Sequence, residues 1–94
     1  MSFHVTATKS FLKELKEIKK TRSSILKHLN ELDTYLTRYG IDHNIRHFFD
    51  IEPLDDGYFR FKFIPYRIIV HVVDTDIYFK KIFKRKWSGD YRTF

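Results

Sequence analysis

Three apolar segments in the second half of the chain have the pattern of β-strands, and they constrain the fold more than any other feature. Within Tyr58–Ile64 every second residue is a phenylalanine, and Arg60 and Lys62 stand between them. Since successive strand side chains point to opposite faces of a sheet, the phenylalanines are predicted to enter a core while the two cations share the other face. Arg67–Val73 and Ile77–Lys84 follow as further strands, separated by a polar turn. The pattern predicts a three-stranded antiparallel meander with a cationic face.

The first half of the chain has the pattern of one strand and two helices. Its opening residues, FHVTA, alternate between apolar and polar as a short strand does. Thr8 or Ser10 can cap a helix whose apolar positions lie within Phe11–Ile18. A second helix is predicted over Ser23–Tyr39, and the glycine that follows is a suitable stop. Because few residues connect the two helices, they are expected to form an antiparallel hairpin.

These elements predict a single α+β domain over residues 1–94. Phe48, Phe49 and Ile51 are expected to begin a further strand that leads to a turn at Asp55–Gly57. The order strand, helix, helix and strands then places the helical hairpin on one face of a twisted, mainly antiparallel sheet of four to five strands. The aromatic residues assigned to core and hairpin packing are Tyr35, Tyr39, Phe48 and Phe49.

Positive charge is concentrated in the half that holds the three strands. Residues 57–94 contain nine Lys or Arg and three Asp or Glu, whereas the preceding residues contain nine of each, and the formal net charge is +6. A field concentrated in this way is expected of a protein that meets a polyanion. The absence of cysteine excludes disulfides, a thiolate nucleophile and a Cys-based zinc site. No apolar run has the length of a signal peptide or a membrane span, so we expect a cytoplasmic protein without a membrane partner.

The histidines do not predict a metal site. His43 and His47 have the spacing of zinc-binding pairs on helices, but their segment has little helical pattern and lacks the glutamate of that motif. We interpret them as solvated loop residues, and we expect no metal and no small-molecule cofactor. His71 lies in the expected central strand. Either it is buried or bonded across strands, or it shares the face of Arg67 and can touch a substrate.

The segment FRFKFIPYRIIVHVVDTDIYF and the ending KRKWSGDY resemble the RelE/ParE superfamily of bacterial toxins, and the resemblance extends over nearly the whole chain. RelE-type ribosome-dependent mRNA endonucleases carry paired basic residues at alternate positions of one strand and an arginine that opens the next. They also carry an arginine at the end of the last strand and a tyrosine six residues later. Arg60 and Lys62 match the pair, and Arg67 matches the opening arginine. Arg85 and Tyr91 match the last two positions.

This resemblance implies a toxin that cleaves mRNA in the ribosomal A site and is neutralised by a cognate antitoxin. RNA transesterification needs a proton acceptor for the 2′-hydroxyl and donors that stabilise the phosphorane. Arg67 and Arg85 are candidates to clamp the phosphate, because arginine stays protonated and donates bidentately. Lys62 or Tyr91 can exchange the proton, since surrounding cations lower a pKa that is ordinarily about 10. No metal is needed in this scheme. The residues expected to contact RNA are Arg60, Lys80, Lys84 and Lys86.

Other interpretations stay open, because a fold does not fix a function. A ParE-like toxin would inhibit DNA gyrase without cutting RNA, and an inactive member of the fold would only bind RNA or a partner. The alternating cations Arg60 and Lys62 are also compatible with the ordinary solvated face of a half-buried strand. The combination of cations and tyrosine favours the endonuclease, since ParE-type toxins generally lack it.

Overall fold

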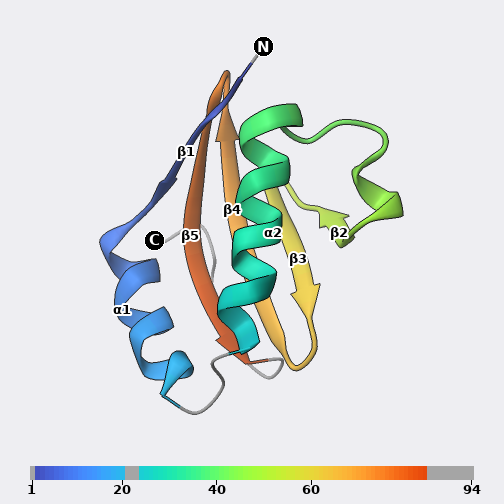
Figure 1. Cartoon of the computed structure of the whole chain (residues 1–94). Coiled ribbons are helices and arrows are strands. Elements are labelled where there is room, and N and C mark those ends of the chain that lie inside the picture. The colour runs from blue at the N-terminus through green and yellow to red at the C-terminus, as the bar shows by residue number, and fades with distance from the viewer. Residues whose placement is uncertain (1, 21–23, 85–94) are drawn as a thin grey trace.

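A five-stranded sheet is the main element of the structure, a computed structural model that describes residues 2–20 and 24–84 (Figure 1). Its strands are β1 (His4–Ala7), β2 (Asp50–Pro53), β3 (Tyr58–Phe63), β4 (Tyr66–Val73) and β5 (Asp76–Lys84). They lie in the order β1-β5-β4-β3-β2. β1 pairs with β5 in parallel, and the other neighbours pair antiparallel. The predicted meander is therefore confirmed as β3, β4 and β5, within a mainly antiparallel sheet.

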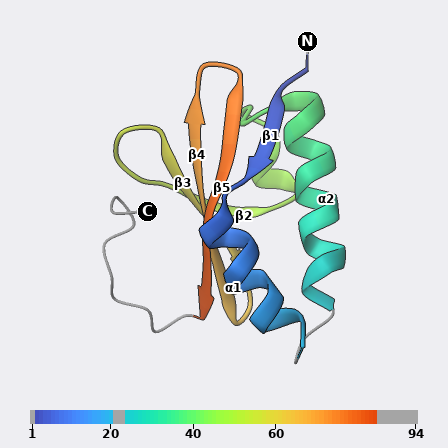
Figure 2. The same ribbon diagram turned by 90° about the vertical axis from the view of Figure 1, so that its left-hand side faces the viewer.

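Two antiparallel helices, α1 (Lys9–Lys19) and α2 (Ser24–Tyr39), complete the α+β fold, and a short 3₁₀ turn, η1 (Ile45–His47), precedes β2. α2 covers one face of the sheet, whereas α1 lies beside β5 (Figure 2). Gly40 follows α2 with a φ of 65°, where a Cβ would also meet the Phe3 ring. Within residues 2–20 and 24–84, no helix is long and apolar enough to cross a lipid bilayer.

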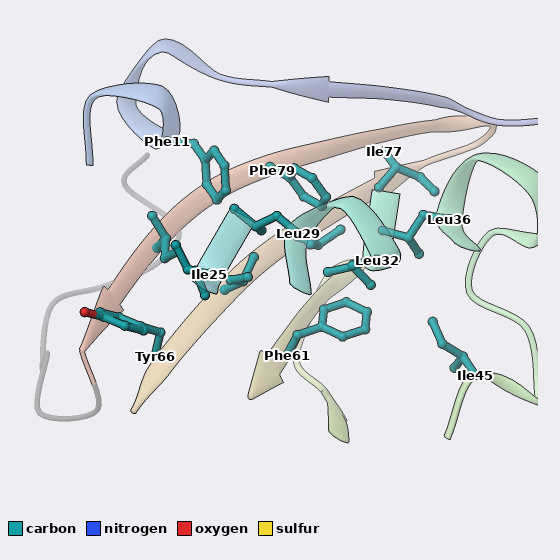
Figure 3. Packing of buried hydrophobic residues seen from close by; sticks show 13 residues of the cluster. Phe11, Ile25, Leu29, Leu32, Leu36, Ile45, Phe61, Tyr66, Ile77 and Phe79 are labelled. Atoms are coloured by element: carbon teal, nitrogen blue, oxygen red, sulfur yellow. The ribbon is translucent and has the colours of Figure 1, made fainter. Parts of the chain in front are cut away.

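The hydrophobic core lies between α2 and the sheet (Figure 3). α2 contributes a stripe of buried residues, which are Ile25, Leu29, Leu32 and Leu36. From the sheet, Phe61 is fully buried, and Phe59 and Phe63 pack against the same cluster with partial exposure. α1 adds Phe11, whose ring centroid lies 5.2 Å from that of Phe79. The phenylalanine alternation therefore predicted the buried face of β3 correctly.

The register between β4 and β5 shifts at one point. Ile69 pairs with Lys81 and Val70 pairs with Phe79, so Lys80 is the extra residue of a β-bulge. In a regular strand without a bulge, Lys81 would share the buried face of Phe79, because residues two apart point to the same side. The bulge instead places Lys81 on the opposite face, beside Ile69.

Two aromatic residues that the sequence assigned to packing lie at the surface instead. Tyr39 is 50% exposed and Phe48 is 68% exposed. Phe48 follows η1 and does not begin a strand, since β2 starts only at Asp50. Its ring therefore packs sideways on Tyr35, with centroids 5.5 Å apart, while the neighbouring Phe49 turns toward the core.

Candidate nucleic-acid interface

The candidate site lies on the face of the sheet turned away from α2, which we call the outer face (Figure 2). By the register, the charged residues that β2, β3 and β4 place on the outer face are Asp50, Glu52, Arg60, Lys62 and Arg67. Residues directly opposite one another on neighbouring strands share a face, with Cβ atoms about 4.5–5.5 Å apart. The cross-strand register therefore shows which of these side chains are neighbours.

Lys62 of β3 lies directly opposite Arg67 of β4. Both side chains are half-buried, and neither forms an ion pair with any residue in the part of the chain that the structure describes. Arg67 donates one hydrogen bond from Nη1 to the carbonyl oxygen of Tyr66, at 3.2 Å. The remaining donors of the guanidinium and the neighbouring ammonium group can bind an anion such as a phosphate.

Arg60 shares the outer face but is already engaged by a carboxylate. Glu52 lies directly opposite it on β2, and the two side chains form an ion pair. The Arg60 side chain is 34% exposed. Two residues of a strand span about 6.6 Å, so Arg60 lies one row away from the pair formed by Lys62 and Arg67. Its charge is partly neutralised by Glu52, which makes it a weaker anion site than that pair.

The structure adds Asp50 of β2 to the site, a carboxylate that the sequence analysis did not name as a candidate. Asp50 lies directly opposite Lys62, so the row Asp50–Lys62–Arg67 crosses three neighbouring strands. Asp50 is exposed and forms no ion pair within residues 2–20 and 24–84. The sequence did hold a signal for this arrangement. Asp50 and Glu52 alternate in the way that the two cations of β3 do, and opposite charges favour direct cross-strand pairing.

The lysines of β5 do not gather at this row. Lys80 occupies the bulge, and Lys81 forms an ion pair with Glu14 of α1. Lys84 lies opposite Tyr66, which is buried in the core, so it belongs to the helix side of the sheet at the end of the strand. The register therefore brings neither Lys80 nor Lys84 beside Lys62. The remaining candidates, Arg85, Lys86 and Tyr91, lie outside the described residues.

His71 combines features of both interpretations that the sequence left open. It lies on the outer face four residues from Arg67, a distance of about 13 Å along a strand. Its ring stacks on Tyr58, directly opposite on β3, with centroids 4.0 Å apart and planes 2° apart. One ring nitrogen, Nε2, lies 3.2 Å from the carbonyl oxygen of Asp56. His71 is therefore held by cross-strand contacts on the same face as the candidate site.

The two hollows beside Tyr35 of α2 are not lined by any of the candidate cations that the structure describes. These hollows, of about 500 and 560 Å³, share Tyr35 and Phe48. His43 and His47 are exposed, and the described residues include no cluster of three or more His, Asp or Glu that could hold a metal ion.

The fold is of the α+β class: two helices pack against a mixed five-stranded sheet, and the helices leave its outer face free. Solved structures identify it as the RelE fold. RelE in the RelB–RelE antitoxin–toxin complex of Methanococcus jannaschii matches with a TM-score of 0.69 and 22% identity, over 86% of this chain and 91% of that one. YafQ of E. coli strain BL21(DE3) matches with a TM-score of 0.68 and 17% identity, over 88% and 93%. The RelE–RelB complex of Pyrococcus horikoshii OT3 gives 0.65 and 22%, over 94% and 100%.

The predicted resemblance is thus confirmed at the level of the fold. By sequence, no family model matches this chain, and no curated protein matches it.

Proposed function

We propose that this protein is the toxin of a type II toxin–antitoxin system, which cleaves mRNA in the ribosomal A site and so inhibits translation. The observation that carries the proposal is the cross-strand register that sets Lys62 beside Arg67 on the outer face of a RelE-like sheet. Two cations without carboxylate partners in the described part of the chain are suited to hold a phosphodiester.

The proposed reaction is attack of a ribose 2′-oxygen on the adjacent phosphorus. The bond from phosphorus to the 5′-oxygen breaks, which leaves a 2′,3′-cyclic phosphate and a 5′-hydroxyl. Arg67 stabilises the charge of the phosphorane, with Arg85 as a second clamp. Lys62 and Tyr91 are the groups proposed to exchange protons. The scheme needs only side chains. Arg60 and Lys86 are proposed as further RNA contacts, whereas Lys80 and Lys84, which the register does not bring beside Lys62, are proposed only to add to the positive field.

The proposed partners are the ribosome, its bound mRNA and a cognate antitoxin. Two of the similar structures contain RelE together with RelB. The net charge of +6 favours an antitoxin with an acidic segment, because opposite charges speed and orient association. A cytoplasmic location follows from this proposal, since mRNA and ribosomes are found there.

The proposal is tested by expressing the protein without an antitoxin and mapping transcript ends in extracts with and without active translation. Wild-type protein is expected to arrest growth and to cut transcripts only when they are translated. Arg67→Ala is expected to lower the cleavage rate about 100-fold or more, the effect of losing one donor to a developing oxyanion. Lys27→Ala is the matched control, because Lys27 is an exposed cation on α2, on the other side of the sheet.

Arg85→Ala and Tyr91→Phe are made in parallel with Arg67→Ala. If all three variants stay fully toxic and cut transcripts at the wild-type rate, the site is wrong. Broken DNA and an SOS response with intact transcripts would indicate gyrase inhibition instead. Soluble expression without growth arrest would indicate a member of the fold that does not cut RNA.

A further inference from the structure

The proposed cleavage needs a group that accepts the proton of the 2′-hydroxyl, and the structure offers a candidate that the sequence did not suggest. Lysine and tyrosine have ordinary pKa values of about 10, so both are largely protonated near neutral pH. An aspartate, with an ordinary pKa of about 3.9, is already ionised there. From the row Asp50–Lys62–Arg67, we infer that Asp50 is the catalytic base of this cleavage, an inference that rests on the proposed function.

The geometry of the row suits this role. Neighbouring strands lie about 4.8 Å apart, so the Cα atoms of Asp50 and Arg67 are separated by about 10 Å, with Lys62 between them. Asp50 and Arg67 both lie on the outer face, one on each side of Lys62. A phosphate held by Arg67 above Lys62 leaves the space toward β2 for the ribose that carries the attacking hydroxyl. The carboxylate and the guanidinium are thus on opposite sides of the reacting group.

Asp50 is distinguished from the other carboxylate of β2 by its contacts. Glu52 forms an ion pair with Arg60, so its negative charge is already neutralised by that cation. Asp50 is exposed and has no ion pair within the described residues. It also borders a hollow of about 450 Å³ that Arg46 and His47 help to line. Arg46 adds a positive charge to the surroundings of Asp50, which lets an RNA strand approach in spite of the carboxylate.

The proton balance closes within the row. Asp50 takes the proton of the 2′-hydroxyl as the bond from the 2′-oxygen to phosphorus forms. Lys62 gives a proton to the departing 5′-oxygen as its bond to phosphorus breaks. The result is a protonated carboxyl directly opposite a neutral amine, and transfer of one proton from Asp50 to Lys62 restores the starting state. No proton is consumed overall, and no other reactant is needed.

The test compares Asp50→Asn with Glu52→Gln, which make the same change of charge on the same strand and the same face. Asp50→Asn is expected to lower the rate of single-turnover cleavage in translating extract at least about 100-fold, as the loss of a general base does. Its affinity for a 2′-O-methyl RNA, which lacks the nucleophile, is expected to be unchanged or higher, because a negative charge has been removed. Glu52→Gln releases Arg60 from its ion pair and is expected to cleave at least as fast as the wild type, whereas Asp50→Glu is expected to keep part of the activity.

The direction in which Asp50→Asn changes the cleavage rate separates a catalytic role of Asp50 from a purely electrostatic one. If Asp50 only screens the cations, removal of its charge would raise both affinity and cleavage, and that result overturns the inference. Equal losses in Asp50→Asn and Glu52→Gln would overturn it as well. Asp50→Ser, which should match Asp50→Asn, guards against a folding defect of one variant. Absence of cleavage by the wild type would overturn the proposed function itself, whereas wild-type and Asp50→Asn proteins that cleave equally would overturn only the role of Asp50.

Discussion

Tyr35 shows how the surroundings of a single side chain set its chemistry. Its ring contacts Tyr39, Phe48 and Phe49, with centroids 4.9, 5.5 and 5.6 Å away. Its hydroxyl donates a hydrogen bond of 2.6 Å to the carboxylate of Asp42. Loss of water around the partly buried hydroxyl, and then the hydrogen bond to Asp42, raise the pKa of Tyr35 to about 12. The folded protein therefore holds this proton more tightly than the unfolded chain does.

This raised pKa gives a prediction for alkaline solution. In the unfolded chain Tyr35 has a pKa of about 10, so its contribution to stability is complete below pH 10 and is lost as the pH rises from about 10 through about 12. The stability advantage of the wild type over Tyr35→Phe is expected to shrink over that range, as measured by urea denaturation. Tyr78→Phe is the control, because Tyr78 lies on β5 opposite His71, on the outer face and away from Tyr35. An advantage that stays constant from pH 9 to pH 12 would contradict the assignment.

The sequence predicted which face of the sheet the charged side chains of β3 occupy, but not which of them form ion pairs. The alternation in β3 correctly placed Arg60 and Lys62 on the face opposite the phenylalanines, because one buried face leaves no other choice. It did not show that Glu52 neutralises Arg60 while Lys62 lacks such an ion pair among the described residues. That difference depends on the register of β2, which a four-residue strand specifies weakly.

At the scale of elements, Thr8 joins the start of α1 to the edge of the sheet. Its Oγ1 accepts a hydrogen bond from the backbone N–H of Phe11, at 3.2 Å, and donates to the carbonyl oxygen of Phe79, at 3.0 Å. β1 pairs with only part of β5, so the rest of that edge has no strand partner among residues 2–20 and 24–84. Farther along, the Glu14 carboxylate accepts a hydrogen bond of 3.4 Å from the backbone N–H of Ile82. α1 thus satisfies edge groups that β1 does not reach.

Thr8 is therefore expected to matter more than the other capping candidate, Ser10. Thr8→Ala removes the N-cap and the bond to β5, and should lower the free energy of unfolding by about 1–2 kcal/mol. Thr8→Ser keeps the hydroxyl and should recover most of this loss. Ser10→Ala changes an exposed position inside α1 and should stay within about 0.5 kcal/mol of the wild type. Urea denaturation of the three variants measures these differences, and equal values for Thr8→Ala and Ser10→Ala would show that the hydroxyl of Thr8 is not used.

Element order and type followed from the sequence, but two local features did not. Strand and helix periods and the stop at Gly40 predicted the order of elements, since each reflects a face that must be buried. The bulge at Lys80 has no glycine or proline to signal it, and it decides on which face Lys81 lies. Phe48 was assigned to packing because large aromatic residues are usually buried, yet its place after η1 turns it outward.

At the scale of the whole molecule, the two sides of the sheet differ in what they present. α2 and the core occupy one side, and the outer face holds the cations of the central strands. Two outer-face cations have carboxylate partners, Arg60 with Glu52 and Lys81 with Glu14. Among the described residues, a polyanion is therefore expected to bind mainly at Lys62 and Arg67, so the strength of binding depends on particular contacts and not on net charge alone.

The salt dependence of RNA binding tests this concentration of contacts. For single strands, the logarithm of the affinity falls with the logarithm of salt concentration by about 0.7 for each phosphate contact. Arg67→Ala is expected to reduce the slope by about 0.7, because one phosphate contact is lost. Lys27→Ala removes the same charge from α2, on the other side of the sheet, and should leave the slope unchanged. Fluorescence anisotropy with a short 2′-O-methyl RNA, between roughly 50 and 200 mM salt, measures the slopes. Equal slopes for the wild type and Arg67→Ala would place the phosphate contacts away from Arg67. Equal reductions of the slope in Arg67→Ala and Lys27→Ala would show that net charge alone sets the salt dependence.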